Sequence, residues 1–171
     1  MKIFKEYLHD DDVASLVNLS KKVQRLDNLR TSYGAWNDDI VQYSSPVLIF
    51  DIPEEYTTNL RKYPELSDMS GFMLYFWPNG SYIPWHDDNH AEKTGTIYLN
   101  DVWERNWGGY LCWEDGYLIP TYNTMALQKG DWHCTTPVTK PLYQIEAYQQ
   151  VKQVLRTTLQ FFKLDPLKAR L

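Results

Sequence analysis

The sequence predicts a mainly β domain of the sandwich or barrel type, with helices leading into it. Short runs rich in β-branched and aromatic residues follow one another in the second part of the chain, and turn dipeptides such as Asn79-Gly80, Asp115-Gly116 and Lys129-Gly130 separate them. Aromatic residues make up 15% of the chain, which suits a sheet-rich core or a pocketed binding surface. Short strands at this spacing favour an all-β sandwich or barrel.

The length of 171 residues predicts one domain that can bury a sizeable core. The residue pattern changes at Gly71: helical periodicity is found before it, and strand-like runs separated by turn dipeptides follow it. Residues 1–70 are therefore expected to form a support region of helices and a strand. Residues 71–163 are expected to form the β core that carries the candidate site.

Two helices are expected in the support region. Apolar residues recur near a 3.6-residue period over residues 10–26, and the acidic cluster Asp10–Asp12 favours the positive end of a helix dipole. Residues 46–52 (PVLIFDI) predict a short strand or a buried run. After Pro53, residues 54–63 predict a second helix with an acidic start.

The β core divides into runs of strand-like composition. Residues 144–152 differ from these runs, because their helical propensity predicts either a helix or an excursion from the sheets. The strand-like runs are residues 72–77, 82–88, 95–100, 109–114, 117–119, 123–128, 131–135 and 154–163.

Composition argues against several classes of function. The net charge is −5 and Lys and Arg form no run, so binding to a nucleic-acid backbone is not expected. No window approaches the roughly 18 apolar residues of a membrane span, and no apolar signal segment is visible, so the cytoplasm is the expected location. Cys112 and Cys134 form neither a C-x-x-C pair nor a disulfide scaffold, although a bridge between them stays open.

A candidate metal site combines two strand-like runs. His86 and Asp88 form an H-x-D pair, and in a strand residues i and i+2 point to the same face. His133 adds a second imidazole, and two histidines with one carboxylate are the facial triad that binds non-haem Fe(II) with open coordination positions. A chance H-x-D pair is the alternative. His90 is a weaker ligand candidate, because pairing with His86 at i, i+4 would require a helix.

Strand alternation also places the tryptophans beside the candidate ligands. If His86 faces inward, Trp85 faces outward, and Trp132 does the same if His133 faces inward. We expect both indoles to pack beneath the N-terminal helices, as part of the core rather than as a surface on which a substrate stacks.

A second group of residues suits a buried anion. Arg156 and Thr158 share one face of the run V-L-R-T-T-L-Q-F-F, and the opposite face is largely apolar. A guanidinium can hold a carboxylate through two parallel hydrogen bonds, and a buried Arg without an anion would be costly. Tyr98, in the run G-T-I-Y-L-N-D, has a phenol that could reach the same anion. The alternatives are an edge-strand Arg in solvent and a Tyr that only packs.

Five segments follow one another in a specific order: W-P-N-G-S-Y-I-P-W-H-D-D-N at 77–89, I-Y-L-N-D at 97–101, W-G-G-Y-L-C-W at 107–113, W-H-C-T-T-P-V at 132–138 and R-T-T-L-Q-F-F at 156–162. This order resembles the prolyl 4-hydroxylase-like group of 2-oxoglutarate/Fe(II)-dependent oxygenases. The resemblance implies a catalytic double-stranded β-helix, or jelly roll, over residues 71–163, with helices packed on one sheet. It makes His86, Asp88 and His133 the iron ligands.

The resemblance also implies the cofactors and their site. Fe(II), 2-oxoglutarate and O₂ are expected, with ascorbate as a candidate accessory reductant. Arg156 matches the basic residue that holds the distal carboxylate of 2-oxoglutarate, Thr158 the hydroxyl two positions on, and Tyr98 the strand tyrosine that contacts that carboxylate. Residues 139–153 are an insertion relative to the family pattern. Lys140 therefore becomes a rival cation, which we expect to be less favoured than Arg156.

The activity implied by the resemblance is hydroxylation of a C–H bond, with a prolyl residue of a peptide or protein as the leading substrate. A free amino acid or other small metabolite is the alternative substrate, and a jelly-roll binding module without activity is the alternative of another class. An open aromatic groove would favour a peptide, and a closed pocket would favour a metabolite. The candidates for lining such a groove are Trp103, Trp107, Tyr110 and Tyr122.

Overall fold

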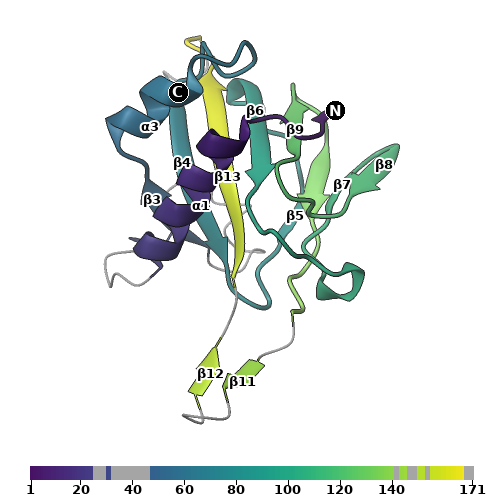
Figure 1. The fold of residues 1–171 in the computed structure, drawn as a ribbon. Coiled ribbons are helices and arrows are strands. Elements are labelled where there is room, and N and C mark those ends of the chain that lie inside the picture. Colours follow the sequence, from purple (N-terminus) through teal and green to yellow (C-terminus); the bar gives the residue numbers. More distant parts are fainter. Residues whose placement is uncertain (25–29, 32–46, 141–142, 146–149, 153–154, 168–171) are drawn as a thin grey trace.

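Within the part of the chain that the computed structural model describes, a large and a small antiparallel β-sheet face each other, and helices α1 (Asp10–Val23) and α3 (Glu54–Leu60) lie against the large one (Figure 1). The structure describes residues 1–24, 30–31, 47–140, 143–145, 150–152 and 155–167. The prediction of a mainly β chain with helices in its N-terminal part is confirmed.

The large sheet has seven strands and is held together by long ladders at its centre. β13 pairs with β4 on one side and with β6 on the other, so the last strand of the chain lies in the middle of the sheet. The strands lie in the order β1 (Lys2–Phe4), β9 (Met125–Gln128), β6 (Ala91–Tyr98), β13 (Arg156–Leu164), β4 (Gly71–Trp77), β3 (Leu48–Asp51) and β2 (Arg30–Thr31).

The small sheet has four short strands, and the chain enters it from the large sheet more than once. β5 lies in sequence between β4 and β6, and β10 lies between β9 and β13, yet both β5 and β10 belong to the small sheet. Its strands lie in the order β5 (Ile83–His86), β10 (His133–Thr135), β7 (Leu111–Trp113) and β8 (Gly116–Leu118). A 3₁₀ turn, η2 (Arg105–Trp107), precedes β7.

Helices α1 (Asp10–Val23) and α3 (Glu54–Leu60) cover the outer face of the large sheet (Figure 1). Both begin with acidic residues, as the helix dipole favours, and both end a few residues earlier than the sequence predicts. Leu16 of α1 and Leu60 of α3 belong to the same buried cluster as Leu74 of β4. No helix in the described ranges has the length and apolar character that crossing a membrane requires.

Strand alternation separates this core from an inner, partly polar layer. On β4, the side chains Phe72, Leu74 and Phe76 pack with the helices, whereas Met73, Tyr75 and Trp77 line a cavity between the two sheets. The side chains of one strand therefore build both the hydrophobic core and the wall of the candidate site.

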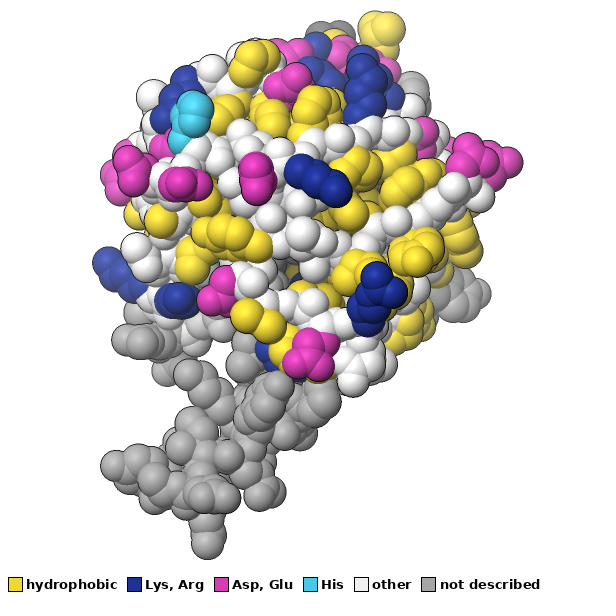
Figure 2. Space-filling view, turned by 45° about the vertical axis from the view of Figure 1, so that its right-hand side comes forward, with side chains coloured by type: hydrophobic (Ala, Val, Ile, Leu, Met, Phe, Trp, Pro, Cys, Tyr) yellow, Lys and Arg dark blue, Asp and Glu magenta, His cyan; other side chains and the backbone are white. Residues whose placement is uncertain are grey.

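Trp85 and Trp132 lie in solvent on the outer side of the small sheet, with exposed fractions of 52% and 59%. The expectation that they pack beneath the N-terminal helices is wrong, because α1 and α3 cover the large sheet. Figure 2 shows the side of the molecule on which the small sheet lies, with hydrophobic side chains open to solvent among charged ones.

For residues 144–152 the sequence predicts a helix or an excursion from the sheets, and where the structure describes them the helix is wrong and the excursion is confirmed. β11 (Tyr143–Ile145) and β12 (Gln150–Lys152) pair in antiparallel fashion and form a separate two-stranded sheet (Figure 1). The helical propensity of this segment is overridden by cross-strand pairing, which depends on context more than on intrinsic preference.

Cys112 of β7 and Cys134 of β10 are direct partners across the small sheet, and both are free thiols. Burial raises the pKa of Cys112, and burial together with Cys112 raises the pKa of Cys134 to about 11. Thiols with raised pKa values stay protonated and are poor nucleophiles. This pair therefore packs within the sheet and offers no activated sulfur.

Candidate metal centre

Three side chains that are distant in sequence meet on the inner side of the small sheet. His86 ends β5 and His133 begins β10, and the two residues are direct partners in the antiparallel ladder. Asp88 lies in the loop just beyond β5 rather than in the strand. Ligand atoms of all three residues lie within 4.8 Å of one another. The structure thus brings together the three residues that the sequence singles out.

Backbone carbonyls orient both imidazoles. His86 Nδ1 lies 2.7 Å from the oxygen of Pro84, and His133 Nδ1 lies 2.7 Å from the oxygen of Asp131. Because a carbonyl oxygen only accepts, each Nδ1 carries the proton and each Nε2 keeps its lone pair. Each Nε2 lies 3.7 Å from an oxygen of Asp88. Metal-binding histidines use the same arrangement, with one ring nitrogen fixed by a carbonyl and the other left for the ion.

The electrostatics keep His86 neutral. Burial and the neighbouring His133 lower the pKa of His86 below its ordinary value, and the hydrogen bond to Pro84 only partly opposes this. The two ring centroids lie 4.2 Å apart, so two imidazolium ions would repel each other strongly. A neutral imidazole is the form that can coordinate a metal.

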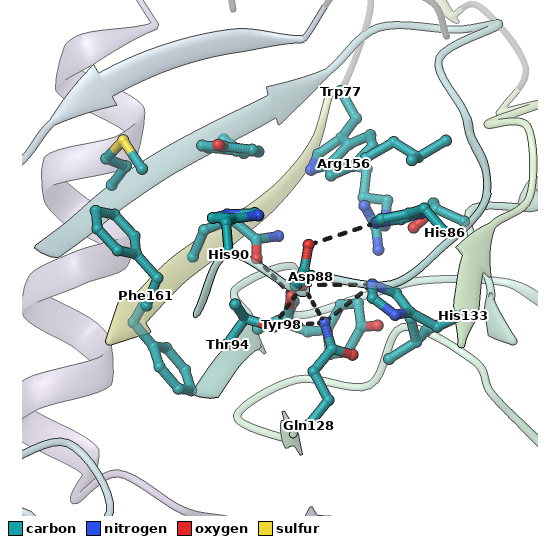
Figure 3. A pocket seen from close by; sticks show the side chains of 18 of the residues that line it. Trp77, His86, Asp88, His90, Thr94, Tyr98, Gln128, His133, Arg156 and Phe161 are labelled. Atoms are coloured by element: carbon teal, nitrogen blue, oxygen red, sulfur yellow. Dashed lines mark hydrogen bonds and ion pairs between the residues drawn. The ribbon is translucent and has the colours of Figure 1, made fainter. Parts of the chain in front are cut away.

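The Asp88 carboxylate is held by two side chains from the large sheet (Figure 3). Thr94 Oγ1 donates to Asp88 Oδ2 at 2.5 Å, and Gln128 Nε2 donates to the same oxygen at 2.8 Å. Thr94 and Gln128 are direct partners on β6 and β9. Sequence patterns do not single out either residue, because their role appears only once the register of these strands is known.

A cavity of about 430 Å³ lies between the sheets, with the three candidate ligands on its wall (Figure 3). Its size is typical of a small-molecule site. His90 also lines this cavity, close to Asp88, but does not belong to the cluster of ligand atoms. The sequence offers His90 only as a weaker ligand candidate, whereas the structure makes it a wall residue.

A buried cation lies in the same cavity. Arg156 is 1% exposed and begins β13, opposite Trp77 on β4. Its guanidinium carbon lies 4.4 Å from the ring centroid of Trp77 and 5.2 Å from that of Tyr98. These cation–π contacts offset part of the desolvation of the charge. However, Arg156 Nε and Nη1 have no hydrogen-bond partner in the described part of the chain.

The hydroxyl of Tyr98 is also buried without a partner among the described residues. Burial raises the pKa of Tyr98, while the charge of Arg156 opposes this shift. Thr158 is fully buried but is not among the residues that line the cavity. Its Oγ1 accepts hydrogen bonds from Trp77 Nε1 at 3.0 Å and from Gln160 Nε2 at 3.2 Å. Arg156 and Tyr98 thus leave polar atoms open to an anion, whereas Thr158 fixes Trp77 beside them.

Lys140, the rival cation, does not line the cavity. Its Nζ lies 3.8 Å from the ring centroid of Trp107 and 5.5 Å from that of Trp103, and burial lowers the pKa of Lys140. Lys140 therefore contacts two indole rings outside the cavity, and Arg156 is the cation that faces the candidate ligands.

The four aromatic residues expected to line a substrate groove lie elsewhere. Trp107 is buried, Trp103 donates a hydrogen bond to the carbonyl of Gly108 at 2.9 Å, and Tyr110 stacks on Tyr117. Tyr122 is 37% exposed. None of these four lines the cavity that holds the candidate ligands, and its aromatic wall comes from other side chains such as Trp77 and Tyr98.

The fold is the one found in 2-oxoglutarate/Fe(II) oxygenases, and prolyl 4-hydroxylases are among the most similar solved structures. A prolyl 4-hydroxylase of Pseudomonas putida has a TM-score of 0.68 at 16% identity, over 96% of this chain and 92% of that one. The viral collagen prolyl hydroxylase of Paramecium Bursaria Chlorella virus-1, in complex with 2-oxoglutarate, has a TM-score of 0.57 at 14% identity, over 94% and 93%.

A structure with another activity is similar as well. The non-haem α-ketoglutarate-dependent epimerase SnoN of nogalamycin biosynthesis has a TM-score of 0.64 at 8% identity, over 94% of this chain and 75% of that one. No protein family's sequence profile matches the chain, and no curated protein matches it in sequence. At these identities the likeness shows the fold, and the function must be argued from the site.

Proposed function

We propose that the protein is an Fe(II)- and 2-oxoglutarate-dependent dioxygenase that hydroxylates a C–H bond of a prolyl residue in a peptide or protein. One observation carries the proposal: the cluster of His86, Asp88 and His133 shares a single cavity with the buried guanidinium of Arg156, two of whose nitrogens have no partner in the described chain. The alternation of strands between two sheets supports a jelly-roll core over residues 71–163 in a single domain.

The three clustered side chains fit iron. Two neutral imidazole nitrogens and one carboxylate oxygen form the donor set of the facial triad, which leaves positions open for other ligands. Bound iron would supply the activation of O₂ for attack on a C–H bond. The chain's own part is to orient both Nε2 atoms toward the ion, which the Pro84 and Asp131 carbonyls do by holding Nδ1 of each ring.

The buried polar atoms fit the distal carboxylate of 2-oxoglutarate. Arg156 Nε, Arg156 Nη1 and Tyr98 OH are donors without an acceptor in the described chain, and leaving them unsatisfied costs free energy. A carboxylate beside them would accept charge-assisted hydrogen bonds and neutralise the buried charge. Trp77, fixed by Thr158, excludes water from one face of the guanidinium.

The charges of the cavity favour an uncharged substrate group. Among the described residues that line the cavity, Arg156 is the only Lys or Arg and Asp88 is the only Asp or Glu. Both are used by the cosubstrate and the metal. A free amino acid would bring an ammonium and a carboxylate without partners, which is costly in a buried site. A prolyl ring within a peptide is uncharged, and Met73 and Tyr75 offer it an apolar wall.

A small uncharged metabolite is the second candidate substrate. It is favoured by the position of Trp103, Trp107, Tyr110 and Tyr122, which do not line the cavity and so form no aromatic groove beside the candidate ligands. A binding module without activity is less favoured, because an intact set of metal-type ligands and a buried cation with unsatisfied donors would destabilise a fold that had no use for them.

A succinate-release assay with Fe(II), 2-oxoglutarate and ascorbate tests the proposal. The panel contains proline peptides with acetylated and amidated ends, free proline and other free amino acids, and mass spectrometry follows hydroxylated products. We expect capped peptides to stimulate succinate release more than free proline. Stimulation by free amino acids alone would contradict the substrate assignment. Absence of any succinate, with or without substrate, would contradict the oxygenase assignment.

A further inference from the structure

The carboxylate of the candidate triad is the one ligand that comes from a loop, so its orientation depends on its neighbours. Asp88 follows the end of β5, whereas His86 and His133 are fixed by strands and backbone carbonyls. A loop carboxylate can rotate and can offer either oxygen. Its hydrogen-bond partners therefore decide which oxygen faces the ion.

The partners of Asp88 are two side chains on paired strands of the opposite sheet. Thr94 on β6 and Gln128 on β9 are direct partners in the ladder, and both point into the space between the sheets (Figure 3). Thr94 Oγ1 and Gln128 Nε2 both donate to Asp88 Oδ2, at 2.5 and 2.8 Å. Each carboxylate oxygen lies 3.7 Å from one imidazole, Oδ1 from His86 Nε2 and Oδ2 from His133 Nε2. The two hydrogen bonds that Oδ2 accepts are therefore what distinguishes it from Oδ1.

The side-chain amide of Gln128 has more acceptors within reach than it has hydrogens to donate. The amide of Gln128 has two N–H hydrogens but three acceptors within reach: Asp88 Oδ2 at 2.8 Å, Thr94 Oγ1 at 2.7 Å and His133 Nε2 at 2.9 Å. A metal on His133 Nε2 would occupy that lone pair. It would displace the hydrogen bond from Gln128 and leave the two amide hydrogens for Asp88 Oδ2 and Thr94 Oγ1.

We propose that Gln128, together with Thr94, is a positioning residue that holds Asp88 Oδ2 and so presents Oδ1 to the metal. This inference rests on the proposed function. Because Thr94 and Gln128 are fixed in paired strands of the large sheet, their hydrogen bonds restrict the rotation of the Asp88 carboxylate. The oxygen that accepts both hydrogen bonds is then less available to coordinate a metal. Bound iron would then take a single oxygen from Asp88, and other coordination positions would stay open.

Co(II) binding to the purified chain under anaerobic conditions tests the inference. Isothermal titration calorimetry gives the dissociation constant, and the visible absorption spectrum of bound Co(II) reports its coordination. Gln128→Met removes the amide at similar volume, and Thr94→Val removes the hydroxyl. Loss of such a hydrogen bond behind a ligand weakens metal binding by about 10- to 100-fold. We expect this loss, with an altered Co(II) spectrum, in both variants.

Thr94→Ser is the matched control, because it keeps the hydroxyl and should bind Co(II) as the unchanged protein does. The melting temperature of the metal-free variants shows whether they fold. A folded Gln128→Met variant with unchanged Co(II) affinity and spectrum would overturn the inference, even if its melting temperature were lower. If the unchanged protein bound no Co(II), the proposed function and this inference would both fail. If the unchanged protein bound Co(II) and the variants bound it equally well, only this inference would fail.

Discussion

A Cβ atom on Gly109 would lie 2.8 Å from Cδ of Arg156, closer than two carbon atoms can pack. Gly109 also has a φ of +69°, a conformation that other residues adopt only with strain. The second glycine of the W-G-G-Y segment therefore does two things. It allows the turn before β7, and it leaves room for the side chain that carries the candidate anion site.

We expect Gly109→Ala to displace the Arg156 side chain. Binding of 2-oxoglutarate to the Co(II)-loaded protein should weaken by about tenfold or more, since a displaced guanidinium loses charge-assisted hydrogen bonds. Co(II) affinity should change little. Gly80→Ala is the control, because Gly80 has a φ of +84° but a methyl group there would have nothing within 4 Å. Equal losses of 2-oxoglutarate affinity in both variants would mean that backbone strain alone is responsible.

Arg156→Ala and Lys140→Ala separate the two candidate cations. Arg156 lies in the cavity wall with unsatisfied donors, whereas Lys140 lies over Trp107 outside it. Removing Arg156 should raise the 2-oxoglutarate concentration needed for half-maximal succinate release by about 10- to 100-fold, as expected for hydrogen bonds to a charged group. Metal affinity should be retained. The opposite pattern, a large effect of Lys140→Ala and a small one of Arg156→Ala, would reverse the assignment.

The lowered pKa of His86 predicts a pH dependence of stability in the metal-free protein. The unfolded chain takes up a proton near the ordinary value of 6.5, but the folded state keeps this imidazole neutral. The contribution of neutral His86 to the free energy of unfolding is fully present above pH 6.5, and it is lost as the pH falls towards the lowered pKa of the folded state. After chelation of metal ions, urea denaturation should show that the free energy of unfolding falls as the pH is lowered below 6.5. His86→Asn should show a shallower dependence, and parallel curves would contradict the argument.

Trp85 and Trp107 differ in burial, so their replacement should affect stability differently. Trp85 is 52% exposed, whereas Trp107 is 4% exposed and contacts Lys140. Trp107→Ala should cost about 3–5 kcal/mol of unfolding free energy, as large-to-small changes in a core do. Trp85→Ala should stay within about 0.5 kcal/mol. Chemical denaturation measures both. A cost at Trp85 that matched the one at Trp107 would indicate that the outer face of the small sheet is covered in solution.

The strands and the three clustered side chains are predictable because their signals are local. Turn dipeptides delimit the runs, and alternation places His86 on the inner side of its strand. The run predicted at 72–77 is β4 at Gly71–Trp77, and the run predicted at 154–163 is β13 at Arg156–Leu164. Even Asp88, which lies outside the strand, stays near enough in sequence to reach the same point.

The rest depends on which strands become neighbours, which no local pattern encodes. Alternation correctly turns Trp85 and Trp132 away from the cavity, but it cannot tell which sheet the helices cover, so the prediction of a core position for these indoles is wrong. The role of Gln128 requires the register of β6 and β9, which places Thr94 opposite it. Trp77 lies over Arg156 only because β4 and β13 are paired.

The most direct test of the account is the metal content of the chain after anaerobic equilibrium dialysis against Fe(II). We expect one ion per chain for the unchanged protein and none for His133→Ala, since two remaining ligands bind iron weakly. His90→Ala should retain the ion, because His90 lines the cavity without joining the ligand cluster. A His133→Ala variant that held iron as tightly as the unchanged protein would contradict the assignment of the metal centre.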